Sequence, residues 1–165
     1  MKMELIQPFI NAADAVLAET LQCPTRVGDV SMDEETYRRK GFAAHVLISG
    51  DIEGRIIFDI DQPTATRIAA YLTGGEASPD DSTLVTETVC ELANMVIGNA
   101  VTTLNDEGFR FKISPPEPHT EEQGCGSTED TEALVLCFDT DKGSLYMNVA
   151  MRYNRRRKNE RTLTA

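Results

Sequence analysis

Apolar residues recur at helical spacing in three stretches of the chain. The first covers about residues 4–21, the second lies between Asp61 and Gly74, and the third ends near Leu104. Local signals agree with these limits: Asp61 can cap the second helix, with Pro63 in its first turn, and Gly74 can end it. Segment 78–81, Ser-Pro-Asp-Asp, can begin the third. The pattern therefore predicts three helices. The start of the first is left open, because Pro8 belongs only in a first turn.

Stretches rich in β-branched and aromatic residues lie between these helices. They predict strands at 26–30, 42–49, 54–60, 109–113, 133–138 and 144–152. Gly-containing segments at 50–54 and 139–143 predict hairpins, and the Pro-, Gly- and acid-rich segment 114–131 predicts a long exposed loop. The order helix, strands, two helices, strands predicts an α+β domain in which helices are layered on a sheet.

The composition fits one globular domain. The chain has 165 residues, of which 41% are hydrophobic, and no apolar run approaches the length of a membrane span. Acidic residues interrupt the first twenty positions, so neither a signal peptide nor an anchor is expected. The four cysteines are scattered without a Cys-x-x-Cys pair, which is typical of reduced thiols and favours a cytoplasmic protein.

Charge is distributed unevenly. Residues 151–165 carry a net charge of +5, which leaves −16 on residues 1–150 of a total of −11. A net charge of −16 repels the phosphates of nucleic acid, so nucleic acid is not expected as a partner. The basic end has two interpretations, a segment loose in solvent or a weak contact with an acidic partner.

The long third helix has two distinct sides. Its apolar stripe consists of Val85, Val89, Leu92, Ala93, Val96, Ala100 and Leu104. The opposite side carries Glu87, Glu91, Asn94 and Gly98 at spacings of four, three and four. This line contains a like-charge pair and a helix-weakening glycine that costs about 1 kcal/mol relative to alanine. Such a line is either an ordinary solvated surface or a functional face, and the spacing alone does not decide between them.

The segment Glu91-Leu92-Ala93-Asn94 resembles the Glu-x-x-Asn signature of the CheC/CheX/FliY phosphatases of bacterial chemotaxis. The similarity is greatest to the CheX branch. It covers most of residues 1–153, including segments 49–58 and 94–98. We therefore expect a single domain over residues 1–153, followed by a basic tail at 154–165. Glu87 stands where the family often has Asp or Ser. The first helix offers only Asn11-Ala12-Ala13-Asp14 in place of a second motif, which suits CheX and argues against CheC-type regulation of a deamidase.

The resemblance implies long helices on one face of an antiparallel sheet and a phosphatase that acts on the aspartyl phosphate of a CheY-type response regulator. Asn94 would orient the attacking water and Glu91 would pair with a lysine of the receiver. Glu87 and Gly98 would contact the partner, Gly98 by allowing close approach. Mg²⁺ would be supplied by the receiver, and relatives imply a homodimer joined through sheet edges.

Two other functions stay open at this point. The same face could bind a receiver or a flagellar switch component without hydrolysis, or the domain could be a dimeric scaffold. A metal site of the protein's own is not expected, because His45 and His119 are distant from each other and from any cysteine pair. Asp59, Asp61, Asp139 and Asp141 fall where strands end, and cap or turn chemistry explains them better than a metal site.

Overall fold

The computed structural model describes residues 3–33, 40–75, 82–118 and 133–154. They form three helices, α1 (Met3–Leu21), α2 (Gln62–Leu72) and α3 (Ser82–Asp106). The strands are β1 (Arg26–Asp33), β2 (Gly41–Gly50), β3 (Ile52–Asp61), β4 (Phe111–Ile113), β5 (Glu117–Pro118), β6 (Ala133–Thr140) and β7 (Gly143–Tyr153). The order in the sheet is β1-β6-β7-β3-β2-β4, and β5 also pairs with β2. Every pairing is antiparallel.

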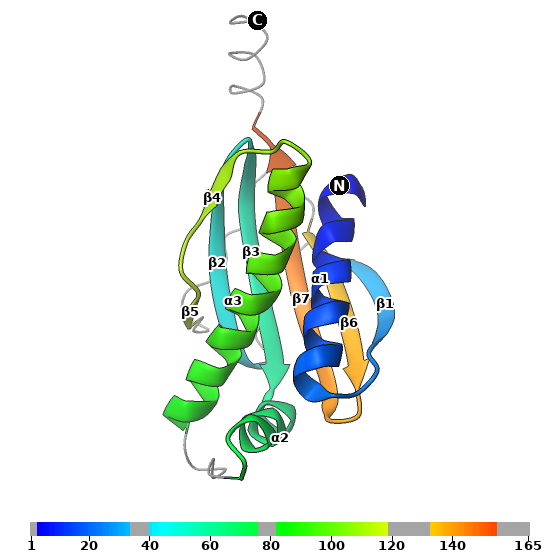
Figure 1. The fold of residues 1–165 in the computed structure, drawn as a ribbon, viewed down its shortest axis with the longest axis vertical. Coiled ribbons are helices and arrows are strands. Elements are labelled where there is room, and N and C mark those ends of the chain that lie inside the picture. Colours follow the sequence, from blue (N-terminus) through cyan, green and yellow to red (C-terminus); the bar gives the residue numbers. More distant parts are fainter. Residues whose placement is uncertain (1–2, 34–39, 76–81, 119–132, 155–165) are drawn as a thin grey trace, which may run out of the picture.

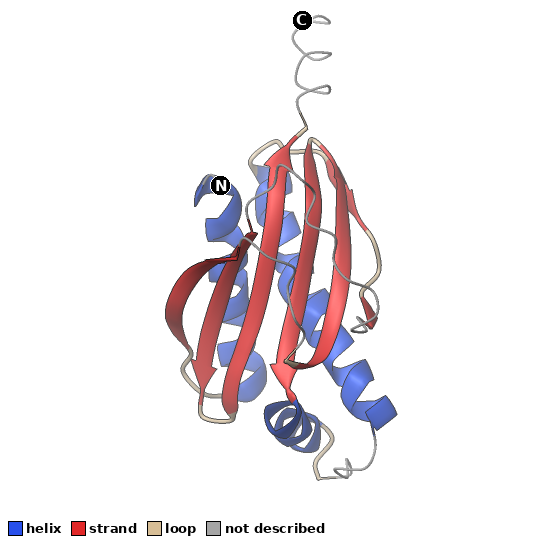
Figure 2. Ribbon diagram, turned by 180° about the vertical axis from the view of Figure 1, so that it is seen from behind, coloured by secondary structure: helices blue, strands red, loops and turns tan. Residues whose placement is uncertain are grey.

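The helices and the sheet form two layers. Helices α1 and α3 run side by side across one face of the sheet, and the short α2 lies near one end of them (Figure 1). Seen from behind, the other face of the sheet has no described helix across it (Figure 2). The predicted α+β architecture, with long helices on one face of an antiparallel sheet, is confirmed.

The core lies between the helices and the sheet. All seven residues of the apolar stripe predicted on α3 are buried, and Ile97 joins them. Opposite them, β3 and β7 contribute side chains with no more than 2% exposure, among them Ile56, Phe58, Met147 and Val149. Burial of this stripe against the sheet fixes the rotation of α3, so the opposite side of the helix must face outward.

The predicted limits of α2 are confirmed. The Asp61 carboxylate accepts a hydrogen bond of 2.9 Å from the backbone N–H of Thr64, and Pro63 lies in the first turn. The helix ends at Leu72, after which Gly74 and Gly75 adopt positive φ angles of 68° and 90°. The proposed cap of α3 at 78–81 lies outside the described residues.

Several details differ from the prediction, among them β1, which extends to Asp33 and not to residue 30. Pro8 lies inside α1 beyond its first turn and is buried there, although a proline cannot donate a backbone hydrogen bond. The predicted hairpin segment 50–54 is mostly strand, because Gly50 ends β2 and residues 52–54 begin β3, which leaves Asp51 as the turn. Segment 114–131 is not wholly a loop, because Glu117 and Pro118 pair with β2; residues 119–131 of this segment lie outside the described residues. Strand β4 is shorter than predicted and begins at Phe111.

Two further results bear on the class of protein. Among the described helices, none is long and apolar enough to cross a membrane. Of the four cysteines, Cys23, Cys90 and Cys137 are free thiols, and Cys125 lies outside the described residues. Of the predicted basic tail 154–165, the structure describes only Asn154.

Candidate functional site

Helix α3 presents the predicted polar line to the outside. Glu87, Glu91 and Asn94 are exposed, and Gly98 is half-buried. The two residues between Glu91 and Asn94, Leu92 and Ala93, are almost completely buried. The backbone of α3 is therefore anchored in the core directly beneath the two polar side chains, about 4.5 Å apart along the axis. A rigid element of this kind can hold a carboxylate and a carboxamide in a fixed relation.

The line forms no side-chain hydrogen bonds or ion pairs within the described part of the chain. Among residues 3–33, 40–75, 82–118 and 133–154, no side chain forms a hydrogen bond or ion pair with those of Glu87, Glu91 or Asn94. A β-carbon built on Gly98 would meet no atom within 4 Å, so packing in the described part of the chain does not require glycine there. The carboxylates and the carboxamide are available to a partner, and the glycine leaves room for one.

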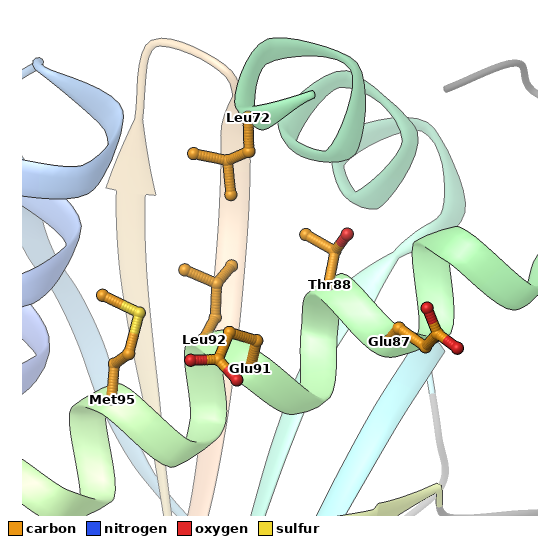
Figure 3. A pocket seen from close by; sticks show the side chains of 6 residues that line it. All are labelled: Leu72, Glu87, Thr88, Glu91, Leu92 and Met95. Atoms are coloured by element: carbon orange, nitrogen blue, oxygen red, sulfur yellow. The ribbon is translucent and has the colours of Figure 1, made fainter. Parts of the chain in front are cut away.

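A hollow of about 340 Å³ adjoins this line on the side that faces α2. It is lined by Leu72, Glu87, Thr88, Glu91, Leu92 and Met95. Figure 3 shows Leu72, at the end of α2, across the space from Leu92 and Thr88, with Glu91 beside Leu92 and Glu87 at one end of the row. Its interior is therefore apolar and its rim is acidic.

The other reactive groups have different explanations. Burial raises the pKa of the Cys90 thiol, and burial together with Asp139 raises that of Cys137, so neither is a ready thiolate. Asp59 accepts hydrogen bonds from the backbone N–H groups of Lys40 and Gly41. Asp61 caps α2, as described above.

The described residues also lack an obvious metal centre. No group of three or more His, Cys, Asp or Glu side chains within them could hold a metal ion. Glu91 and Asn94 by themselves offer two oxygen ligands, which is few for a hard cation such as Mg²⁺.

The chemistry available on the line is limited and specific. Asn94 carries a carboxamide, which is not among the side chains that form covalent intermediates in catalysis. Asn94 can both donate and accept hydrogen bonds without titrating, and Glu91 can pair with a cation. The arrangement can position a water molecule and fix the register of a cationic partner.

Comparison with known proteins identifies the family. The family model described as "Chemotaxis phosphatase CheX" matches residues 42–139, more than half of the chain. The chain belongs to the CheX family. Glu87, Glu91, Asn94 and Gly98 all lie within the matched region.

Individual relatives agree with the family. The "CheY-P phosphatase CheX" of Thermotoga maritima is 22% identical over 116 residues, 70% of this chain and 75% of that protein. A chain of the CheX–CheY–BeF3–Mg²⁺ complex from Borrelia burgdorferi is 32% identical with a TM-score of 0.73, over 92% of this chain and 99% of that one. A CheC-like protein from Shewanella sp. PV-4 has a TM-score of 0.80 at 20% identity, over 92% of this chain and 99% of that one, and shows the shared fold.

The hollow beside the line was not predicted from the sequence. Met95 follows Asn94 directly and remains 39% exposed, and this large apolar side chain at the edge of a polar face was the available signal. Leu72 gave no such signal, because it belongs to another helix and only the packing of α2 brings it opposite α3.

Proposed function

We propose that this CheX-family protein is a phosphatase that hydrolyses the aspartyl phosphate of a CheY-type response regulator, in chemotaxis or a related two-component pathway. The observation that carries the proposal is the exposed pair Glu91 and Asn94 on α3, without partners in the described chain. The name of the Thermotoga relative and the complex of the Borrelia relative support this substrate.

Asn94 orients the attacking water in this proposal. Hydrolysis of an acyl phosphate breaks the bond between phosphorus and the aspartyl oxygen, and water supplies the new oxygen. The products are inorganic phosphate and a free carboxylate. Phosphoryl transfer depends chiefly on an in-line nucleophile and on neutralised charge, so one carboxamide that accepts a hydrogen bond from the water suffices. Because Asn94 does not titrate in the neutral range, its contribution should not depend on pH.

Glu91 positions the partner. Its carboxylate would repel the phosphoryl group but can pair with a lysine of the receiver, which sets the docking register. Mg²⁺ belongs to the receiver in this scheme. It neutralises phosphoryl charge there, and the Borrelia complex, which contains CheY and Mg²⁺, is consistent with that assignment.

Glu87 and Gly98 extend the contact surface along α3. Glu87 lies one turn before Glu91, and Gly98 lies one turn beyond Asn94, where the open space above it permits close approach of a partner backbone.

The proposal includes a homodimer, which the family resemblance implies, and a cytoplasmic location, which the scattered cysteines favour. The described sheet offers β1 and β4 as outer strands, and outer strands carry unpaired backbone groups that can join a second sheet. Light scattering of the full chain tests the dimer: a monomeric mass at micromolar concentration contradicts it.

The experiment that tests the activity follows the loss of phosphate from a phosphorylated CheY-type receiver in the presence of Mg²⁺. The wild-type protein should accelerate this loss, and Asn94→Ala should remove about a hundredfold or more of the acceleration, as for other positioned catalytic groups. Because alanine favours a helix, Asn94→Ala should be at least as stable as the wild-type protein.

The matched control is Asn99→Ala, the same change on the same helix about 140° around its axis from Asn94. It should retain full activity. If the wild-type protein and Asn94→Ala bind the receiver equally and neither accelerates hydrolysis, the domain is a receiver-binding adaptor and the enzymatic proposal is wrong.

A further inference from the structure

The hollow beside the line has no role in the hydrolysis proposed above. Four of its six lining residues present apolar surface. Leu92 is buried at its floor, whereas Leu72 and Met95 are 40% and 39% exposed at its sides. The hydroxyl of Thr88 donates a 2.8 Å hydrogen bond to the Leu84 carbonyl, so this residue offers chiefly its methyl group. Such a concave apolar surface is suited to a side chain from another molecule.

The rim of the hollow determines what kind of side chain fits. Glu87 and Glu91 stand one turn apart on α3, both exposed and both without a cation in the described part of the chain (Figure 3). A purely apolar occupant would remove water from around the two carboxylates without giving them a cation to pair with, which is energetically unfavourable. A lysine or arginine avoids that cost, because its aliphatic stem can cover apolar surface while its charged end reaches the rim.

We propose that the hollow receives a basic side chain of the response regulator, distinct from the lysine that Glu91 binds on the line. Its stem lies between Leu72 and Met95, and its cationic end pairs with Glu87. This inference rests on the proposed function, since it places the same partner on α3. It assigns to Glu87 and Leu72 a part in selecting among receivers, because only a receiver with a basic residue at that position fills the site.

Binding tests the inference separately from hydrolysis. A CheY-type receiver activated with beryllofluoride and Mg²⁺ is titrated with the wild-type protein, Glu87→Gln and Leu72→Gln. Each variant should weaken binding about tenfold, the size expected for a partly desolvated charge pair or its apolar support. KM for the phosphorylated receiver should rise by a similar factor while kcat stays unchanged, since neither residue touches the reacting atoms.

Two control variants match these changes. Asp106→Asn removes the same charge from the far end of α3, about 28 Å from Glu87 along the axis. Leu47→Gln removes an exposed leucine, 52% accessible, from β2. Both should bind as the wild-type protein does. If Asp106→Asn weakens binding as much as Glu87→Gln, the effect is general charge steering and the pairing in the hollow is wrong.

A charge exchange identifies the occupant. Exposed lysines and arginines of the receiver are changed singly to glutamate, and one of these changes should weaken binding to the wild-type protein and be rescued by Glu87→Lys. If Leu72→Gln weakens binding to the receiver and Glu87→Gln does not, the occupant is apolar and the inference is wrong. The inference is also wrong if both variants bind the receiver as the wild-type protein does. If the wild-type protein binds the receiver but does not hydrolyse its phosphate, the proposed phosphatase activity is wrong. The binding affinities of the variants would still test whether the hollow receives a basic side chain.

Discussion

Gly98 lies one helical turn beyond Asn94 on the outward side of α3, and a β-carbon at Gly98 would meet no atom of the described residues within 4 Å outside its own stretch of helix. The helix therefore retains a glycine that the described packing does not need, next to the residue proposed to orient water. A glycine in a helix interior is unfavourable, so its presence at this position fits a requirement imposed from outside the molecule.

Gly98→Ala should stabilise the protein by about 1 kcal/mol, because alanine has the higher helix propensity and has room here. The same change should reduce phosphatase activity by keeping the partner's backbone at a distance. Urea denaturation measures the first effect and receiver dephosphorylation the second. Raised stability together with full activity would show that nothing approaches Gly98 closely.

Gly54→Ala should have the opposite effect on stability. Gly54 adopts a φ of 149°, and a β-carbon there would lie 1.9 Å from the Ala150 carbonyl oxygen of the neighbouring β7. Overpacking and backbone strain together should cost about 3 kcal/mol or more. Gly74→Ala is the control, because Gly74 also has a positive φ but, among the described residues, no atom within 4 Å of a β-carbon built on it. Thermal unfolding compares the two, and similar melting temperatures would contradict the close contact.

Asp61→Ala should destabilise the protein by about 1 kcal/mol, because it removes the side chain that caps α2 at the backbone N–H of Thr64. Chemical denaturation measures this loss. Asp61→Asn and Asp61→Ser should retain most of the stability, since both side chains can cap a helix. Equal losses for all three variants would mean that the carboxylate acts in another way.

Tyr153 should make stability sensitive to alkaline pH. Burial and the hydrogen bond that its hydroxyl donates to Glu4 raise its pKa from 10.0 to about 12. A group whose pKa is raised on folding contributes stability fully below its unfolded pKa and loses that contribution as pH rises through the folded value. Stability should therefore fall between about pH 10 and pH 12.

Tyr153→Phe isolates this effect. Phenylalanine can keep the stacking on Phe109, whose ring centre lies 6.0 Å away, but has no proton to lose. The variant should be less stable at neutral pH and show a shallower loss between pH 10 and 12. Unfolding measured across that range checks it, with Tyr71→Phe as the control for tyrosine removal at an exposed site. An unchanged slope would exclude Tyr153 as the source.

Local sequence signals were sufficient for the helices and for the line on α3. The apolar stripe from Val85 to Leu104 fixes which side of the helix is buried, since hydrophobic burial acts on every residue of the stripe in the same direction. The placement of Glu91 and Asn94 on the outside follows directly. The limits of α2 are set by Asp61, Pro63 and Gly74. These signals are also local, because helix capping depends only on residues within one turn of the helix end.

Contacts between distant segments decided the rest. Glu53 looks like a turn residue until β3 pairs with β7, where it lies opposite Arg152. Glu117 looks like a loop residue until it pairs with His45. The hollow exists only because the end of α2 brings Leu72 opposite Leu92. Sequence periodicity reports how each element orients toward water, which is a local property. The spacing between two elements depends on the packing of all the side chains between them, and only the tertiary structure contains that information.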